Sequence, residues 1–166
     1  DRFYLPDGNI KFKLDNGEVY NVHRYFFEAH SSKFAAEYLC NSLADVVKLP
    51  GVASLDFECF LSLIYPSSLG KCDIATPEEW TSVLRLADKW SFADLKVFAL
   101  EGLESASPVD RIIVARESDL PDWLLPAYRD LCFTPEPLVL EDAERLGFPA
   151  FVALNQNKEK SRRDHG

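Results

Sequence analysis

Few residues of the chain have the types and spacing that metal or acid–base chemistry requires. His23 and His30 stand seven residues apart, which places them about two helical turns apart, and no third ligand lies near them in the sequence. We therefore interpret His23 as a core residue that hydrogen-bonds to the backbone. The four cysteines form no Cys-x-x-Cys pair and show no ligand-like spacing with histidine: Cys40, Cys59, Cys72 and Cys132. The sequence thus predicts no metal site.

Catalytic signatures are also missing from the sequence. It contains no Gly-x-Ser-x-Gly, no His-Glu-x-x-His and no phosphate-binding loop, and it has only seven glycines. The paired carboxylates Glu78-Glu79 and Glu141-Asp142 fall in the first turns of expected helices, where acidic side chains stabilise the helix dipole. We predict that the protein is not an enzyme and binds no cofactor.

The charge of the chain is uneven. The net charge is −9 at pH 7, although residues 155–166 hold four basic and two acidic side chains. An acidic body repels a phosphate backbone, so we expect no nucleic-acid binding by the main domain. The basic end, residues 155–166, is expected to form a flexible, solvated tail.

No apolar run approaches the roughly 20 residues that span a bilayer, so we expect no membrane insertion. Cysteines without a pairing pattern favour a reducing compartment and hence an intracellular location, in the cytoplasm or the nucleus. Methionine is absent even at position 1, so we expect the chain to be an excerpt or a processed form.

Period-two patterning predicts a small sheet near the start of the chain. Ile10, Phe12 and Leu14 alternate with lysines, as in a half-buried strand. Asn16-Gly17 is expected to supply the two positive φ angles of a tight hairpin turn, after which Val19 to Val22 returns as the partner strand. A third strand is expected at residues 46–49, before Pro50-Gly51.

Helical signals follow these strands. Ser31 or Ser32 can cap a helix that carries Phe34 and Tyr38 on one face, and Ser54 is expected to cap the next helix. Thr76-Pro77-Glu78-Glu79 has the residues of a capping box with proline at the first helical position.

After Ser107 the sequence pattern changes to that of helices separated by prolines. Pro121, Pro126, Pro135 and Pro137 divide this region, and Gly147 is placed to end a helix over residues 140–146. A last short helix is expected to begin near Pro149 and to bury three apolar side chains: Phe151, Val152 and Leu154.

The order of these elements resembles the BTB (POZ) domain. The hairpin runs into His23-Arg24, which matches the family's "HR-x-x-L" helix start, and Ser31-Ser32-Lys33-Phe34 matches its "S-x-x-F" step before the third strand. The resemblance implies an α+β fold, a three- to five-stranded sheet with surrounding helices, over residues 1–105. A BACK-like helical extension would follow at residues 106–154 and the tail at 155–166. The extension resembles that of fungal, mushroom-type (basidiomycete) BTB proteins.

BTB domains bind proteins, so the resemblance implies a non-catalytic interaction module that self-associates as a homodimer. Family dimers pair an N-terminal strand and the first helix, and residues 3–5 are either exchanged in this way or folded back on their own chain. The interface candidates are Phe3, Tyr4, Leu5, Asn9, Arg24, Tyr25, Phe34, Glu37 and Tyr38.

Two alternatives remain within this family. Arg24 pairs in some members with an acid on the first strand, a role left here to Asn9 or to Asp7. Other members are substrate adaptors that bind a cullin scaffold of a ubiquitin ligase through a hydrophobic-x-Glu element. Ala35-Ala36-Glu37 is a poor match to that element because alanine supplies little contact area, and no substrate-recruiting domain is visible.

Overall fold

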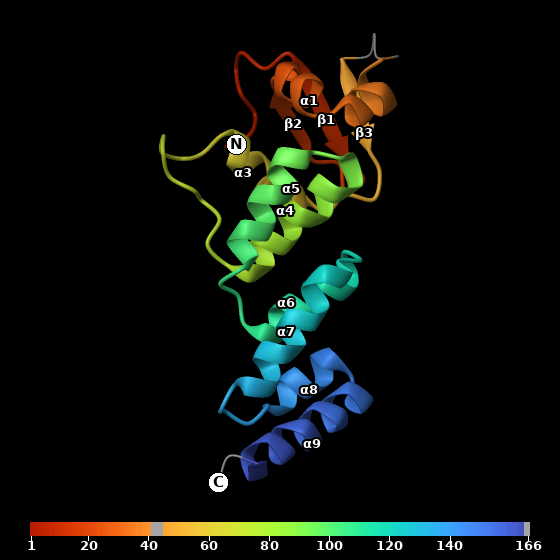
Figure 1. Ribbon diagram of the computed structural model, residues 1–166. Coiled ribbons are helices and arrows are strands. Elements are labelled where there is room, and N and C mark those ends of the chain that lie inside the picture. The colour runs from red at the N-terminus through yellow and green to blue at the C-terminus, as the bar shows by residue number, and fades with distance from the viewer. Residues whose placement is uncertain (41–44, 165–166) are drawn as a thin grey trace. The chain divides into compact units, whose positions relative to one another are not determined.

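The computed structural model describes residues 1–40 and 45–164 (Figure 1). The chain divides into two compact units, Asp1–Leu103 and Glu104–Gly166. The first unit holds a sheet with helices, and the described part of the second consists of helices joined by loops, without a strand. This is an α+β fold followed by a helical extension, as the sequence predicts.

The sheet of the first unit has the strand order β2-β1-β3. β1 (Ile10–Leu14) pairs antiparallel with β2 (Val19–Val22) and parallel with β3 (Val46–Leu49). Alternation decides which face is buried, because Phe12 is fully buried while Lys13 next to it is exposed. The three predicted strands are confirmed.

The hairpin turn differs from the prediction. The loop between β1 and β2 spans residues 15–18, and Gly17 alone of the expected pair has a positive φ, at 91°. Its N–H donates to Leu14 O at 3.0 Å, while Asn16 Oδ1 accepts from the N–H of Glu18 at 3.0 Å. The asparagine therefore closes the turn with its side chain and does not need a left-handed backbone.

The helices of the first unit are α1 (Arg24–His30), α2 (Ser32–Phe34), the π-helical turn η1 (Ala35–Leu39), α3 (Ser54–Ile64), α4 (Pro77–Trp90) and α5 (Ala93–Leu103). The capping box of Thr76 and Glu79 and the Ser31 cap are confirmed. Ser54 is not a cap. It is the first helical residue after Ala53, and its hydroxyl accepts from Asn16 Nδ2 at 2.6 Å and donates to Glu18.

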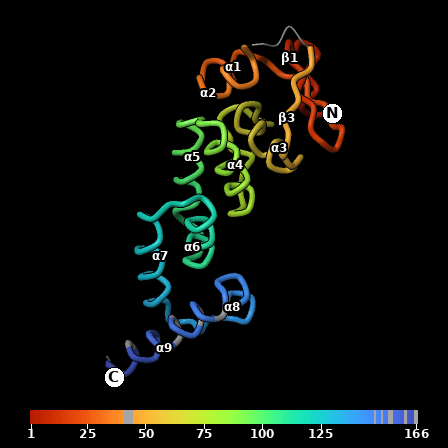
Figure 2. The backbone as a smooth tube through the Cα atoms, turned by 90° about the vertical axis from the view of Figure 1, so that its right-hand side faces the viewer, coloured from red at the N-terminus to blue at the C-terminus, as the bar shows by residue number. Residues whose placement is uncertain are grey.

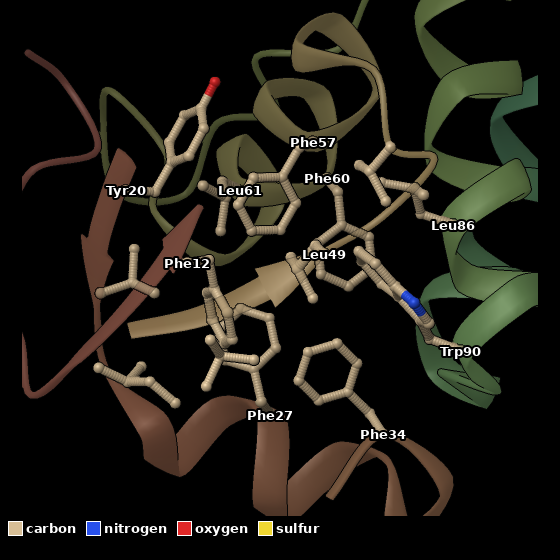
Figure 3. Packing of buried hydrophobic residues seen from close by; sticks show 14 of the residues in the cluster. Phe12, Tyr20, Phe27, Phe34, Leu49, Phe57, Phe60, Leu61, Leu86 and Trp90 are labelled. Atoms are coloured by element: carbon tan, nitrogen blue, oxygen red, sulfur yellow. The ribbon is translucent and has the colours of Figure 1, made fainter. Parts of the chain in front are cut away.

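An aromatic cluster fills the space between the sheet and these helices (Figure 3). Phe12 meets Phe27 of α1 edge-on, with ring centroids 4.8 Å apart, and Phe34 meets Trp90 of α4 in the same way at 5.1 Å. Each such side chain contributes about 1.5–3 kcal/mol through burial. The cluster thereby fixes which face of α1 is buried.

The second unit contains α6 (Pro108–Glu117), α7 (Pro121–Phe133), α8 (Leu140–Leu146) and α9 (Phe148–Asp164). α6 and α7 lie side by side (Figure 2) and enclose a small core of Val109, Ile112, Ala127, Leu131 and Leu146. Pro126 lies inside α7 and does not end it. Gly147 ends α8 with a φ of 88°, as predicted.

The last helix is longer than we expected. α9 continues to Asp164, so the residues expected to form a flexible tail are helical from 155 to 164. The buried Lys158 helps to hold this part in place, because its Nζ donates to the carbonyl oxygens of Thr134 and Glu136 at 2.9 and 2.8 Å. Val152 is exposed and not buried, and the side chains of Phe151 and Leu154 lie outside the described part of the structure.

Candidate interaction surface

The N-terminal segment lies along the free edge of β2. Asn21 donates its backbone N–H to Phe3 O at 3.0 Å, and Leu5 donates its N–H to Asn21 O at 2.8 Å. The Asn21 side chain adds a third bond to Leu5 O at 2.6 Å. Of the two arrangements that the sequence left open, the structure of the single chain shows this segment folded back on its own sheet.

A charged contact holds the start of this segment. The Arg2 guanidinium is hydrogen-bonded to the Asp73 carboxylate and donates to Tyr65 O at 3.0 Å. Hydrogen bonds from Ser67, followed by the contribution of Arg2, lower the pKa of Asp73 below its ordinary value. The loop before α4 therefore serves as the anchor of the N-terminal segment.

Residues 3–5 differ in what they offer to a partner. Phe3 is buried in the core of its own chain and Leu5 is half-buried, while the side chain of Tyr4 is 45% exposed. Phe3 is therefore unavailable to a partner as long as the segment stays folded back. Tyr4 is the member of the trio that the folded chain presents on its surface.

Asn9, one of the two residues to which the sequence left the contact with Arg24, caps α1. Asn9 Oδ1 accepts from the backbone N–H of Arg24 at 2.8 Å, where the N-cap residue His23 provides no side-chain bond. The guanidinium donates to Glu28 at 3.0 Å and to Leu39 O at 3.5 Å. The strand-to-helix link is thus a helix cap, and Arg24 ties α1 to η1.

α1 presents an aromatic side chain to the surface. Tyr25 is 68% exposed, whereas Phe27 on the same helix is fully buried between the sheet and α3. Exposed tyrosines offer apolar area and a polar hydroxyl at low entropic cost, and are enriched at protein interfaces.

The remaining candidates lie on α2 and η1. Phe34 is fully buried in the aromatic cluster, so it cannot form an interface while the fold is intact. Glu37 is exposed and Tyr38 is half-buried, with its ring 4.8 Å from that of Phe34. Burial, and to a smaller extent the neighbouring Glu37, raise the pKa of Tyr38. Glu37 and the edge of Tyr38 are what this segment offers to a partner.

A comparison with known families agrees with this arrangement. The BTB/POZ domain profile matches residues 8–106, which include the sheet, α1 to α5 and the first residues of the second unit. The chain belongs to the BTB/POZ family. No curated protein matches the chain. The BTB/POZ domain is a protein–protein interaction module, and this chain contains such a domain.

The described part of this BTB protein contains no group of three metal-ligating side chains. We expected His23 to lie in the core and to hydrogen-bond to the backbone. It is half-buried instead, and its two ring nitrogens face side chains. Its Nδ1 lies 3.2 Å from the Tyr65 hydroxyl and its Nε2 lies 3.3 Å from Asp7. None of the described helices has the length and apolar content needed to cross a membrane.

A surface hollow of the BTB domain was not predicted from the sequence. It has a volume of about 250 Å³ and lies between α1, the end of α3 and the start of α5. Its walls are mostly apolar and are formed by Phe26, His30, Leu63, Ile64, Phe92, Asp94 and Leu95. These residues come from segments up to about 70 positions apart, so no local sequence pattern reveals the hollow.

Proposed function

We propose that this BTB domain is a non-catalytic interaction module that self-associates through the outer face of α1 and the N-terminal segment. The observation that carries the proposal is the position of Tyr25. It projects from a helix whose opposite side is locked into the aromatic core, so it is exposed on a rigid support. Rigid, exposed aromatic side chains are the anchors that stable interfaces use.

The N-terminal segment supports the same proposal. Residues 3 and 5, which make the backbone bonds to Asn21, are joined to the rest of the chain by a short connection, residues 6–8. If that connection opens, the segment can make the same bonds to Asn21 of a second copy of the chain. Exchange of an identical element creates a dimer at low cost because every contact is kept. Tyr4, already exposed, then lies near the exchange point.

Sedimentation equilibrium of the intact chain and of Tyr25→Ser tests the role of α1. We expect a dimer for the intact chain and at least a tenfold weaker association for the variant, as for an interface anchor that contributes about 2 kcal/mol. Leu69→Ser is the matched control, because Leu69 is 97% exposed on a loop and its replacement leaves α1 unchanged. A monomeric intact chain, or equal dimerisation of the Tyr25 variant, contradicts the proposal.

Strand exchange has a separate test that avoids deleting the segment, since deletion removes Phe3 from the core. Arg2→Glu and Asp73→Arg each place like charges at the anchor. Mixing the two variants restores both Arg–acid contacts only in an exchanged heterodimer. We expect the mixture to dimerise more tightly than either variant alone. The double variant Arg2→Glu/Asp73→Arg, which restores the contact within one chain, is the control for folding.

A cullin adaptor is the second candidate function, and one observation supports it. Ala36 and Glu37 are both exposed on η1, and π-helical turns often mark functional sites. Binding of a cullin N-terminal domain to the intact chain and to Glu37→Lys, measured by calorimetry, tests this role. Loss of binding in the variant supports it, and absence of binding by the intact chain excludes it. The resemblance of the helical extension to that of fungal BTB proteins stays a prediction.

A further inference from the structure

One side of α1 carries Phe26, with a contact between a histidine and an aspartate near each end of the helix. His23, Phe26 and His30 are spaced three and four residues apart, so they lie in one row along the helix. His23 Nε2 lies 3.3 Å from Asp7, and His30 Nδ1 lies 3.7 Å from Asp94 of α5. The two histidines are about 10.5 Å apart along the helix axis, since each residue rises about 1.5 Å.

Beside the His30–Asp94 pair, which forms part of its wall, the surface is hollow and mostly apolar. Phe26 forms part of the hollow of about 250 Å³, together with Ile64 at the end of α3 and Leu95 on α5. Toward His23 the apolar surface continues, because the ring of Phe26 lies 5.6 Å from that of Tyr65 and 6.5 Å from that of His23. The hollow thus has room for one or two apolar side chains of a partner.

The two carboxylates are open to a further cation. The side chains of Asp7 and Asp94 are 81% and 88% exposed, so each has oxygen lone pairs directed to solvent. Charged side chains on neighbouring turns are already engaged by other groups. Glu28 accepts from Arg24, and Lys96 forms a salt bridge with Asp88.

We propose that this groove binds an amphipathic helix of a partner protein that carries two apolar residues between two basic residues placed seven positions apart. A helix with lysines at positions i and i+7 and leucines at i+3 and i+4 presents all four side chains on one face, with the lysines about 10.5 Å apart. The apolar pair fills the hollow and the lysines meet Asp7 and Asp94. The groove goes beyond self-association, because it is lined by Phe26 and His30 and not by Tyr25.

The walls favour a helix over an extended peptide. Residues of α1, α3, α5 and the turn before α5 line the hollow, and no residue of β1, β2 or β3 does so. Recognition of an extended segment by strand addition requires a free sheet edge, whereas a groove between helices accepts the apolar face of a helix.

Fluorescence anisotropy with a labelled, capped alanine-based peptide of 15 residues tests the proposal. The peptide has lysines at positions 4 and 11 and leucines at positions 7 and 8. We expect saturable binding to the intact chain. The variant Asp7→Asn/Asp94→Asn should bind about fivefold more weakly, as expected for the loss of two exposed ion pairs. Leu95→Asp should lose more affinity than this double variant. Amide chemical shifts should change at α1 and the start of α5.

Two controls make the result specific. A peptide of the same composition with its lysines at positions 6 and 13 presents them on the opposite face and should bind at least fivefold more weakly. The variant Asp45→Asn/Glu101→Gln removes two exposed acids outside the groove and should bind normally. Equal binding of both peptides, unchanged affinity of the Asp7/Asp94 variant, or no binding at 1 mM overturns the proposal. Sedimentation of the same samples reports self-association independently, so the two proposals fail separately.

Discussion

Asn9 Oδ1 accepts a hydrogen bond from the backbone N–H of Arg24 at 2.8 Å and thereby caps α1 from a residue fifteen positions earlier. The first turn of a helix leaves backbone N–H groups without partners, and the residue in the N-cap position, His23, does not supply one. The residue that precedes β1 therefore sets where α1 begins. Because α1 carries both Tyr25 and the row of His23, Phe26 and His30, this one bond helps to position both surfaces.

Asn9→Ala should destabilise the first unit by about 0.5–2 kcal/mol, the usual cost of a lost N-terminal cap. Urea unfolding followed by tryptophan fluorescence measures the change, with hydrogen exchange of the amides of α1 as a local readout. Asn9→Asp keeps the acceptor and adds a favourable charge at the helix N-terminus, so it should be as stable as the native chain. Equal stability of the alanine and aspartate variants contradicts the cap.

Gly102 lies against the indole of Trp80, and its missing side chain makes this contact possible. A Cβ at Gly102 would lie 2.7 Å from Cζ2 of Trp80 and closer still to two further ring carbons. Gly102→Ala should therefore destabilise the α4–α5 pair by about 1–2 kcal/mol, because overpacking outweighs the gain in helix propensity of about 1 kcal/mol.

A double-mutant cycle separates these two effects of Gly102→Ala. In the background of Trp80→Leu the space is free, so the same substitution should become neutral or stabilising. Denaturant unfolding of the four proteins gives the coupling free energy. A destabilisation that persists in the leucine background would show that the glycine is needed for a reason other than the indole.

Glu79 makes the stability of α4 dependent on acidic pH. Backbone hydrogen bonds from Ala75 and Thr76 hold the pKa of the Glu79 carboxyl below its ordinary value of 4.5. The unfolded chain therefore binds the proton at a higher pH than the folded chain. The stabilisation is complete above the ordinary pKa and is lost as the pH falls through the lower folded pKa.

Glu79→Gln should remove this part of the acid sensitivity. The free energy of unfolding of the native chain and of the variant, measured between pH 7 and pH 3, should differ most at pH 7 and converge at low pH. Glu78→Gln is the matched control, since Glu78 is exposed in the same turn and closes no capping box. If the difference in the free energy of unfolding between the native chain and Glu79→Gln is constant across the whole pH range, Glu79 is not the source of the acid sensitivity.

Local patterns of the sequence predict the strands of the first unit and the start of α4. The alternation of Ile10, Phe12 and Leu14 specifies β1, and Thr76-Pro77-Glu78-Glu79 specifies the start of α4, because each depends on neighbours within one turn or strand. The predictions that were wrong concern features that depend on contacts between residues far apart in the chain. Ser54 looks like a cap locally, but its hydroxyl is engaged by Asn16 and Glu18.

In the candidate surfaces, too, some features follow from local patterns and others depend on distant contacts. The exposure of Tyr25 follows from helical periodicity once Phe27 is placed in the core. The burial of Phe3 and the pairing of His30 with Asp94 depend on which segments meet in space, which no spacing of three or four residues encodes. A histidine seven residues from another looks like an incomplete metal site in the sequence, and only the fold shows an acid beside each.

Lys158 is one of the residues that hold α9 against the segment after α7. It is buried, and its Nζ donates to the carbonyl oxygens of Thr134 and Glu136. Desolvation, followed by repulsion from Arg162, lowers the pKa of this amine. Between that lowered pKa and the ordinary value of 10.5 the unfolded chain binds more protons, so the stability of the second unit should rise with pH in this window.

Lys158→Met should destabilise the second unit by about 1–3 kcal/mol, because two carbonyl groups lose their donor while the apolar stem is kept. Hydrogen exchange of the α9 amides measures the loss, and the first unit should be unaffected. Lys160→Met is the matched control, because Lys160 is exposed two residues later on the same helix. If the α9 amides are equally protected from exchange in the Lys158 and Lys160 variants, other contacts hold this helix. The predicted rise of stability with pH should then be absent as well.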